Sequence, residues 1–134
     1  MFEMILGHLV GDYLLQNDMM AQTKSKNTVL GWIVCFMHCM FYTTSVCLMM
    51  KNYNLNWIII VFISHFFIDK FSLANYWMNM MGKRTPYQWY LMFEAGEDKP
   101  EDVIHASFSS IVYCVVDNTM HILLMYYGWR YLYL

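Results

Sequence analysis

Charged residues are scarce in this chain of 134 residues. Only 13% of the residues are Asp, Glu, Lys or Arg, about half the share that is usual in soluble proteins. The net charge of -2 excludes the basic field that nucleic-acid binding requires, so no nucleic-acid partner is expected. The chain also has only 2 Pro and 6 Gly, which excludes a collagen-like fibre and a linker-rich array.

Cysteine is present without the spacing of a disulfide framework or a zinc knuckle. The four residues, Cys35, Cys39, Cys47 and Cys114, lie inside apolar runs, where free Cys packs as a small apolar side chain. In contrast, 59% of the residues are hydrophobic and 19% are aromatic, which excludes a disordered chain. A small membrane protein or an unusually apolar soluble helical domain remains.

One segment is long and apolar enough to cross a membrane. Residues 28–50 (TVLGWIVCFMHCMFYTTSVCLMM) contain no Lys, Arg, Asp or Glu over 23 positions. A helix of that length rises about 34 Å, and the hydrocarbon core of a bilayer is about 30 Å thick. A soluble chain of this size has too little interior to surround such a helix, so we predict that the segment is transmembrane.

Three further segments are mostly apolar, and they cover residues 2–20, 57–81 and 103–127. The connections are short except for a polar loop over residues 82–102, whose YQWYLMF centre suits the membrane surface. We therefore predict a single transmembrane domain over residues 1–134. It is an all-α integral membrane four-helix bundle, up-down-up-down, with both termini on the same side. The first segment lacks the basic flank of a signal peptide, so we expect it to be retained.

The positions of Lys and Arg predict the orientation. The connections over residues 21–27 and 82–102 share one side of such a bundle, and they hold Lys24, Lys26, Lys83, Arg84 and Lys99. The opposite side holds Lys51 and Arg130. By the positive-inside rule, both connections are cytoplasmic and both termini lie outside.

Ionisable side chains recur inside the expected spans. Four His and three Asp fall there: His8, Asp12, His38, His65, Asp69, Asp117 and His121. In three of the helices a His and an Asp are four residues apart and share one face, and Gln16 extends the first of these faces. Ionisable groups in a membrane cost several kcal/mol each unless they are paired, coordinated or hydrated, so such clusters mark functional sites.

Depth along the helices places these groups together. Counted from the outer end of each helix at about 1.5 Å per residue, all seven lie about 9–18 Å deep. This agreement predicts a single polar site in the outer half of the bundle.

A metal ion would account for such a site. Helical bundles build metal sites from such pairs on facing helices, so all seven residues are candidate ligands. Imidazole and carboxylate ligands suit zinc, the expected ion, with iron or manganese as alternatives. Seven candidates exceed the four ligands of a closed zinc site, so one or two ions are expected. Asp12, Asp69 and His38 are the candidate catalytic groups, one of them acting as general base on a metal-bound water.

The same residues also suit two roles that need no metal ion. His and Asp can hydrogen-bond across helices and hold the bundle together. They can also form a proton or ion pathway, and a transport function in so short a chain requires a homo-oligomer or a larger assembly.

The motifs resemble those of an uncharacterised family of small membrane proteins from bacteria and their phages. The family has an H-L-x-x-D-x-x-L-Q opening, a Lys-containing loop, an isolated His, an H-F-x-x-D segment and a D-Q-x-x-H segment. The matching positions are His8, Asp12 and Gln16, Lys24 or Lys26, His38, His65 with Asp69, and Asp117 with His121. Asn118 departs from the pattern, since the family usually has Gln there.

The resemblance implies the membrane fold and, by its source, a bacterial inner membrane with a phage-encoded chain as one origin. In such a membrane, the orientation that the Lys and Arg positions predict puts the termini in the periplasm. The layout is also similar to that of membrane-bound metal-dependent hydrolases. We therefore expect a metal-dependent hydrolase that acts on a lipid-borne or membrane-accessible substrate, with the lipid bilayer as its partner. A transport component and a non-catalytic phage protein that binds a host partner are the alternatives.

Overall fold

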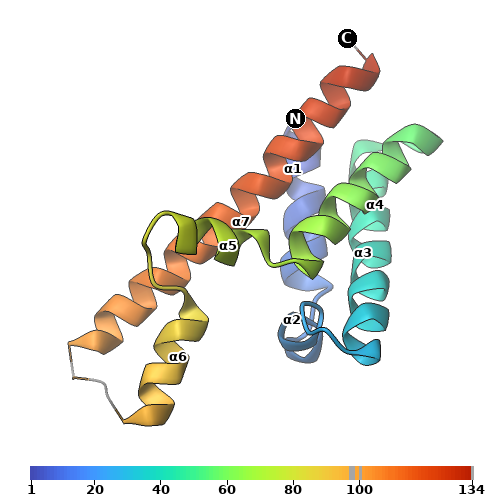
Figure 1. The fold of residues 1–134 in the computed structure, drawn as a ribbon. Coiled ribbons are helices and arrows are strands. Elements are labelled where there is room, and N and C mark those ends of the chain that lie inside the picture. The colour runs from blue at the N-terminus through green and yellow to red at the C-terminus, as the bar shows by residue number, and fades with distance from the viewer. Residues whose placement is uncertain (97–98, 100, 134) are drawn as a thin grey trace. The chain divides into compact units, whose positions relative to one another are not determined.

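The computed structural model describes residues 1–96, 99 and 101–133, and every regular element in this part of the chain is helical (Figure 1). The all-α class is therefore confirmed. The elements are α1 (Phe2–Leu9), the π-helical segment η1 (Val10–Leu14), α2 (Asp18–Thr23), α3 (Val29–Met50), α4 (Leu55–Lys70), α5 (Leu73–Met80), α6 (Pro86–Ala95) and α7 (Asp102–Tyr133).

The chain length predicts one domain, whereas the structure divides the chain into two compact units. The first unit comprises Met1–Ser72 and Met120–Leu134, and the second comprises Leu73–Thr119. Helix α7 contributes residues to both units, with its second half in the first unit.

The first expected helix, over residues 2–20, is shorter than predicted. Helix α1 continues into η1 and ends at Leu14, and α2 starts as a separate helix after Asn17. The physical reason is local, because Asn17 is extended and its side chain accepts a hydrogen bond from the Met20 backbone N–H at 2.9 Å. Asn favours this capping position over a helix interior.

Two glycines allow α1 and η1 to lie very close to α3. A Cβ atom on Gly7 would lie 2.7 Å from the Cα atom of Val46, and one on Gly11 would lie 2.7 Å from the Tyr42 ring. Close packing through small residues is typical of helices in membranes. It brings the polar face of the first helix against the middle of α3.

Helix α3 agrees with its predicted range of 28–50. It begins after Thr28, whose hydroxyl accepts a hydrogen bond from the Gly31 N–H at 3.1 Å, and ends at Lys51 in a left-handed conformation. The expected helix over residues 57–81 differs, because it is interrupted between α4 and α5, where Ser72 has a φ of 48°. A positive φ in a non-glycine residue cannot continue a helix.

The expected loop over residues 82–102 contains a helix. Helix α6 begins with a capping box, in which the Thr85 hydroxyl accepts from the Gln88 N–H and the Gln88 side chain accepts from the Thr85 N–H. Pro86 occupies the first turn, where its missing N–H costs nothing. The helix-breaking residues of this segment therefore bound a helix of ten residues.

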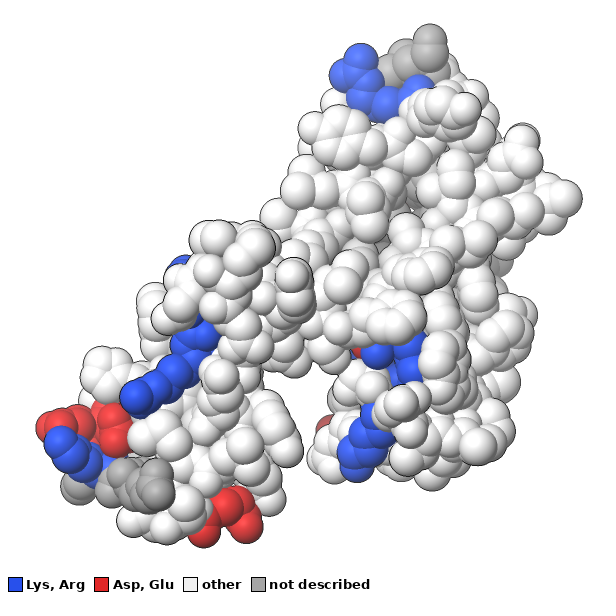
Figure 2. Space-filling model, viewed as in Figure 1, with Lys and Arg blue, Asp and Glu red and all other residues white. Residues whose placement is uncertain are grey.

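Among the described residues, two helices, α3 and α7, are long and apolar enough to cross a membrane, and the number rises to three if α4 and α5 count as one bent span. The residues of α3 and α7 that lie more than half exposed include Val29, Leu30, Ile33, Ile104, Phe108 and Ile111. On the face shown in Figure 2, charged side chains form a few separate patches and leave most of the surface uncharged. Such surfaces indicate membrane association.

The apolar core of the first unit joins helices from both ends of the chain. Met4, Tyr42, Val46, Trp57, Val61 and Met125 are almost fully buried against one another. They come from α1, α3, α4 and the second half of α7. This packing holds in place the four helical segments that carry the polar cluster.

Candidate metal centre

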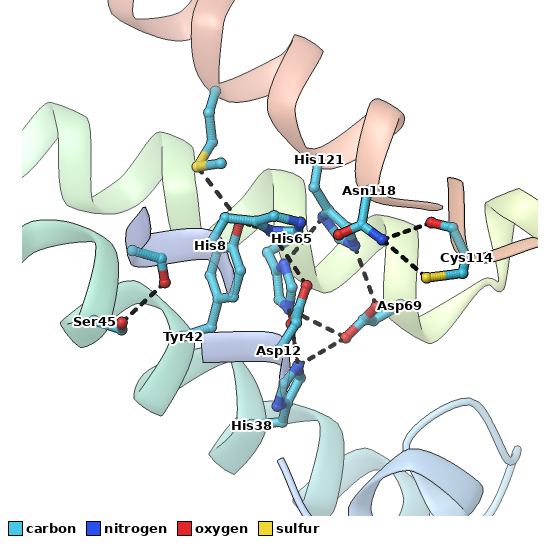
Figure 3. Close-up of polar contacts among 12 residues, drawn as sticks. His8, Asp12, His38, Tyr42, Ser45, His65, Asp69, Cys114, Asn118 and His121 are labelled. Carbon is cyan, nitrogen blue, oxygen red and sulfur yellow. Dashed lines mark hydrogen bonds and ion pairs between the residues drawn. The ribbon is translucent and has the colours of Figure 1, made fainter. Parts of the chain in front are cut away.

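Six of the seven predicted site residues converge inside the first unit (Figure 3). They are His8, Asp12, His38, His65, Asp69 and His121. Asp12 has 10% of its side chain exposed, and the side chains of the other five are exposed by 2% or less. We call these six residues the His/Asp cluster.

Four ligand atoms of the cluster lie at metal-ligand spacing. His38 Nε2 lies 2.9 Å from His65 Nε2, 3.2 Å from Asp12 Oδ1 and 3.2 Å from Asp69 Oδ2. His65 Nε2 lies 3.4 Å from Asp12 Oδ1 and 3.2 Å from Asp69 Oδ2. Ligand atoms about 2.1 Å from a tetrahedral zinc ion lie about 3.4 Å apart, so these spacings suit one ion.

A second group shares two of these residues. His121 Nε2 lies 3.5 Å from Asp69 Oδ1, and the Nδ1 atoms of His65 and His121 lie 3.0 Å apart. Asp69 therefore directs one carboxylate oxygen to each group. His65 likewise faces His38 with one ring nitrogen and His121 with the other.

Local helix geometry explains the pairs that the sequence predicts. His65 and Asp69 are one turn apart on α4, and the same spacing brings His8 Nδ1 within 3.3 Å of Asp12 Oδ2. Asp12 lies in the middle of η1. Single π-helical turns are rare and occur frequently at functional sites.

Sequence reasoning missed Tyr42 as a site residue. Its hydroxyl lies 2.9 Å from His8 Nδ1 and donates to Met125 Sδ at 3.4 Å, and its ring stacks on His65 with centroids 3.5 Å apart. The signal was present, because Tyr42 follows His38 by one helical turn on α3. A tyrosine inside an apolar segment is, however, equally expected as an ordinary core residue, so the sequence alone did not mark Tyr42 as part of the site.

Lys24 was predicted only as a cytoplasmic charge and as a match to the family's lysine. Its ammonium donates to Asp69 Oδ2 at 2.7 Å and lies 3.5 Å from His38 Nε2. The backbone of its segment is held by Lys70, which donates to the carbonyl oxygens of Lys24 and Lys26 at 3.2 Å and 2.8 Å. No helical spacing connects positions 24 and 69, so only the matching lysine in the family motif pointed to Lys24.

The charges of the cluster favour a bound cation. Two ionised carboxylates, Asp12 and Asp69, and one ammonium, Lys24, leave a net charge of -1 when the imidazoles are neutral. A buried net charge is costly unless it is compensated. A proton or a metal ion would supply the missing positive charge.

The remaining candidates lie elsewhere. Asp117, the seventh predicted ligand, is half-buried in the second unit and belongs to neither metal-ligand group, so its role as a ligand stays a prediction. Asn118 donates to the carbonyl of Cys114 on its own helix at 2.6 Å. Gln16 is half-buried near the end of the first helix, with no hydrogen-bond partner for its Oε1 atom in the described structure.

The fold and the cluster together define a class. This is an all-α protein with helices able to cross a membrane and with buried His/Asp groups able to hold a metal ion. The chain belongs to the family described as Protein of unknown function (DUF3307), whose family model matches residues 1–132. The resemblance to an uncharacterised family is thereby confirmed. No curated protein and no solved structure matches the chain.

Proposed function

We propose that this protein is an integral membrane, metal-dependent hydrolase that acts on a lipid-borne or membrane-accessible substrate. The observation that carries the proposal is a set of four buried ligand atoms, in which the Nε2 atoms of His38 and His65 lie within 3.4 Å of each other and of one oxygen each on Asp12 and Asp69. Zinc suits two imidazoles and two carboxylates, with iron or manganese as alternatives.

The geometry favours one ion over two. His65 and Asp69 have atoms close to both His38 and His121, so a second ion would have to share them. His8 and His121 contact the outer carboxylate oxygens of Asp12 and Asp69. In this arrangement they orient the carboxylates that ligate the ion, as residues hydrogen-bonded to metal ligands commonly do.

A divalent ion held by these residues would lower the pKa of a bound water toward about 7 and so would supply a nucleophile at neutral pH. Asp12 is the most exposed member of the cluster, which supports a substrate position on its side of the ion. Its second oxygen faces His8, so Asp12 is the group best placed to accept a proton and pass it on. Asp69 is held by Lys24 and serves as the fixed ligand.

The membrane setting completes the proposal. Helices α3 and α7 cross the bilayer, α4 with α5 forms an interrupted third span, and α1 with η1 completes the four-helix bundle. The termini face the periplasm of a bacterial host, following the Lys and Arg distribution. A homo-oligomer would cover the apolar surface that a small bundle leaves exposed.

A second candidate function is supported by one observation. The two ring nitrogens of His65 bridge His38 and His121 at 2.9 Å and 3.0 Å, so three imidazoles form a continuous chain. Such a chain can relay protons by alternating donor and acceptor roles. A proton- or ion-coupled transport component is therefore the alternative.

Elemental mass spectrometry of the detergent-purified protein tests the proposal. We expect about one zinc, iron or manganese ion per chain, lost in His65→Ala and Asp12→Asn. His105→Ala is the matched control, because His105 is an exposed histidine of the second unit. Lipid phosphates and esters are then the substrates to screen.

Metal-free wild-type protein that is well folded would overturn the hydrolase. Proton flux into vesicles that contain the wild-type protein, abolished by His65→Ala, would then support the relay. Stoichiometric metal that survives both His65→Ala and Asp12→Asn would show that the ion binds outside the cluster.

A further inference from the structure

The second unit contains a cavity that the proposed reaction does not use. It has a volume of about 350 Å³ and lies between the start of α6 and the first half of α7. Lys83, Arg84 and His105 contribute polar groups to its wall, and Met78, Trp89 and Phe108 contribute apolar surface. No acidic residue is among the described residues that line it.

Aromatic contacts hold the cationic groups in place. The Arg84 guanidinium lies 4.8 Å from the ring centroid of Trp89, and Lys83 Nζ lies 5.6 Å from that of Trp77. The His105 ring stacks on the buried Trp89, which is the same ring that Arg84 contacts, and the two ring planes are 13° apart. Cation–π contacts restrict flexible basic side chains without neutralising their charge.

The backbone around the cavity is also fixed. The carbonyl oxygen of Arg84 accepts a hydrogen bond from the buried Ser109 hydroxyl on α7. The capping box of Thr85 and Gln88 follows directly and starts α6. Lys83 and Arg84 therefore stand just before the N-terminus of a helix of ten residues, whose partial positive charge adds to theirs.

We propose that this cavity binds the phosphate headgroup of an anionic phospholipid. The guanidinium fork of Arg84 matches two phosphate oxygens, Lys83 supplies a second positive charge, and a His105 ring N–H supplies a further donor. Phe108, which is largely exposed, provides apolar surface for the start of the acyl chains. A water-soluble phosphate ester would leave that surface unused. In the orientation that the Lys and Arg distribution predicts, this loop also lies on the cytoplasmic side, where anionic lipids attract basic residues.

Native mass spectrometry of the detergent-purified full chain tests this proposal. The protein is titrated with phosphatidylglycerol, with phosphatidylcholine of the same acyl chains, and with glycerol 3-phosphate. We expect phosphatidylglycerol to be retained at least fivefold more than phosphatidylcholine. Arg84→Gln and Lys83→Gln should each lower that retention at least threefold.

Lys99→Gln is the matched control, because it removes one exposed charge from the same connection without altering the cavity wall. It should leave phosphatidylglycerol retention unchanged. Equal retention of the two lipids, an equal loss in Lys99→Gln, or glycerol 3-phosphate binding as tight as that of phosphatidylglycerol would each overturn the proposal. Both Lys83 and Arg84 are exposed, so Lys83→Gln tests the site even if Arg84→Gln fails to fold. The outcome is independent of metal content.

Discussion

Lys24 and Asp69 form a partly buried ion pair of 2.7 Å at the edge of the His/Asp cluster, although 45 positions separate them in the sequence. The same ammonium lies 3.5 Å from His38 Nε2. A fixed positive charge therefore stands next to two of the four atoms proposed to hold a metal ion. It balances one of the two carboxylates and competes with a bound cation for the same oxygen.

This competition predicts the effect of Lys24→Met on metal affinity. Removing a positive charge that contacts Asp69 leaves its oxygen free for the ion and removes repulsion, so the affinity should rise about tenfold, or about 1.4 kcal/mol. Competition with a chromogenic chelator measures this. Lys26→Met is the control, because the Lys26 side chain is exposed and only its carbonyl oxygen contacts Lys70. Weaker binding in Lys24→Met would show that the lysine supports the ion instead.

Tyr42→Phe should reduce activity more than stability. The substitution removes the hydroxyl that lies 2.9 Å from His8 Nδ1 and keeps the ring stacked on His65. Loss of the hydroxyl's buried hydrogen bonds with His8 and Met125 lowers the free energy of unfolding by about 1–2 kcal/mol. Looser positioning of His8 and Asp12 should lower turnover about tenfold, as measured on whichever lipid substrate the screen identifies. Tyr53→Phe, at an exposed tyrosine, should change neither quantity.

Gly7→Ala should separate α1 from α3. A Cβ atom there would lie 2.7 Å from the Cα atom of Val46, which is backbone and cannot rotate away. Overpacking of this kind costs about 1–3 kcal/mol, and the shift of α1 should also carry Asp12 away and lower metal content. Denaturation in detergent and elemental analysis measure the two effects.

Gly96→Ala is the comparison for that substitution. Gly96 has open space around the position of a Cβ atom and a φ of 67°, so only backbone strain of about 1 kcal/mol is expected. Metal content should not change. If both variants lost metal equally, the close contact between α1 and α3 could not be the cause of the loss in Gly7→Ala.

Removal of the metal should lower the melting temperature of the wild-type protein. An ion that binds only the folded state at 100 times its Kd stabilises that state by about 2.7 kcal/mol. Thermal unfolding with and without a strong chelator measures this, and His65→Ala should unfold at the same temperature in both conditions. A chelator that leaves the wild-type melting temperature unchanged would be inconsistent with a metal held by the cluster.

Some features follow from sequence alone, because their cause is local. The spacing of His65 and Asp69 predicts that they share a helix face, and the structure shows them in contact at 3.2 Å. The apolar run over residues 28–50 predicts the one helix whose bounds agree within a residue. Helical periodicity and hydropathy depend only on neighbouring residues and on backbone sterics.

Contacts between distant segments depended on the tertiary structure. Local sequence patterns did not predict that Lys24 lies beside Asp69 or that Tyr42 stacks on His65. They also did not predict that Asp117 belongs to neither ligand group. These results depend on how close helices approach, and two glycines set that distance for the first helix. Composition and spacing determined which side chains line each helix. Packing between distant segments decided which of these side chains contact one another. Contacts between helices depend on how the side chains interdigitate, and helical periodicity does not specify this.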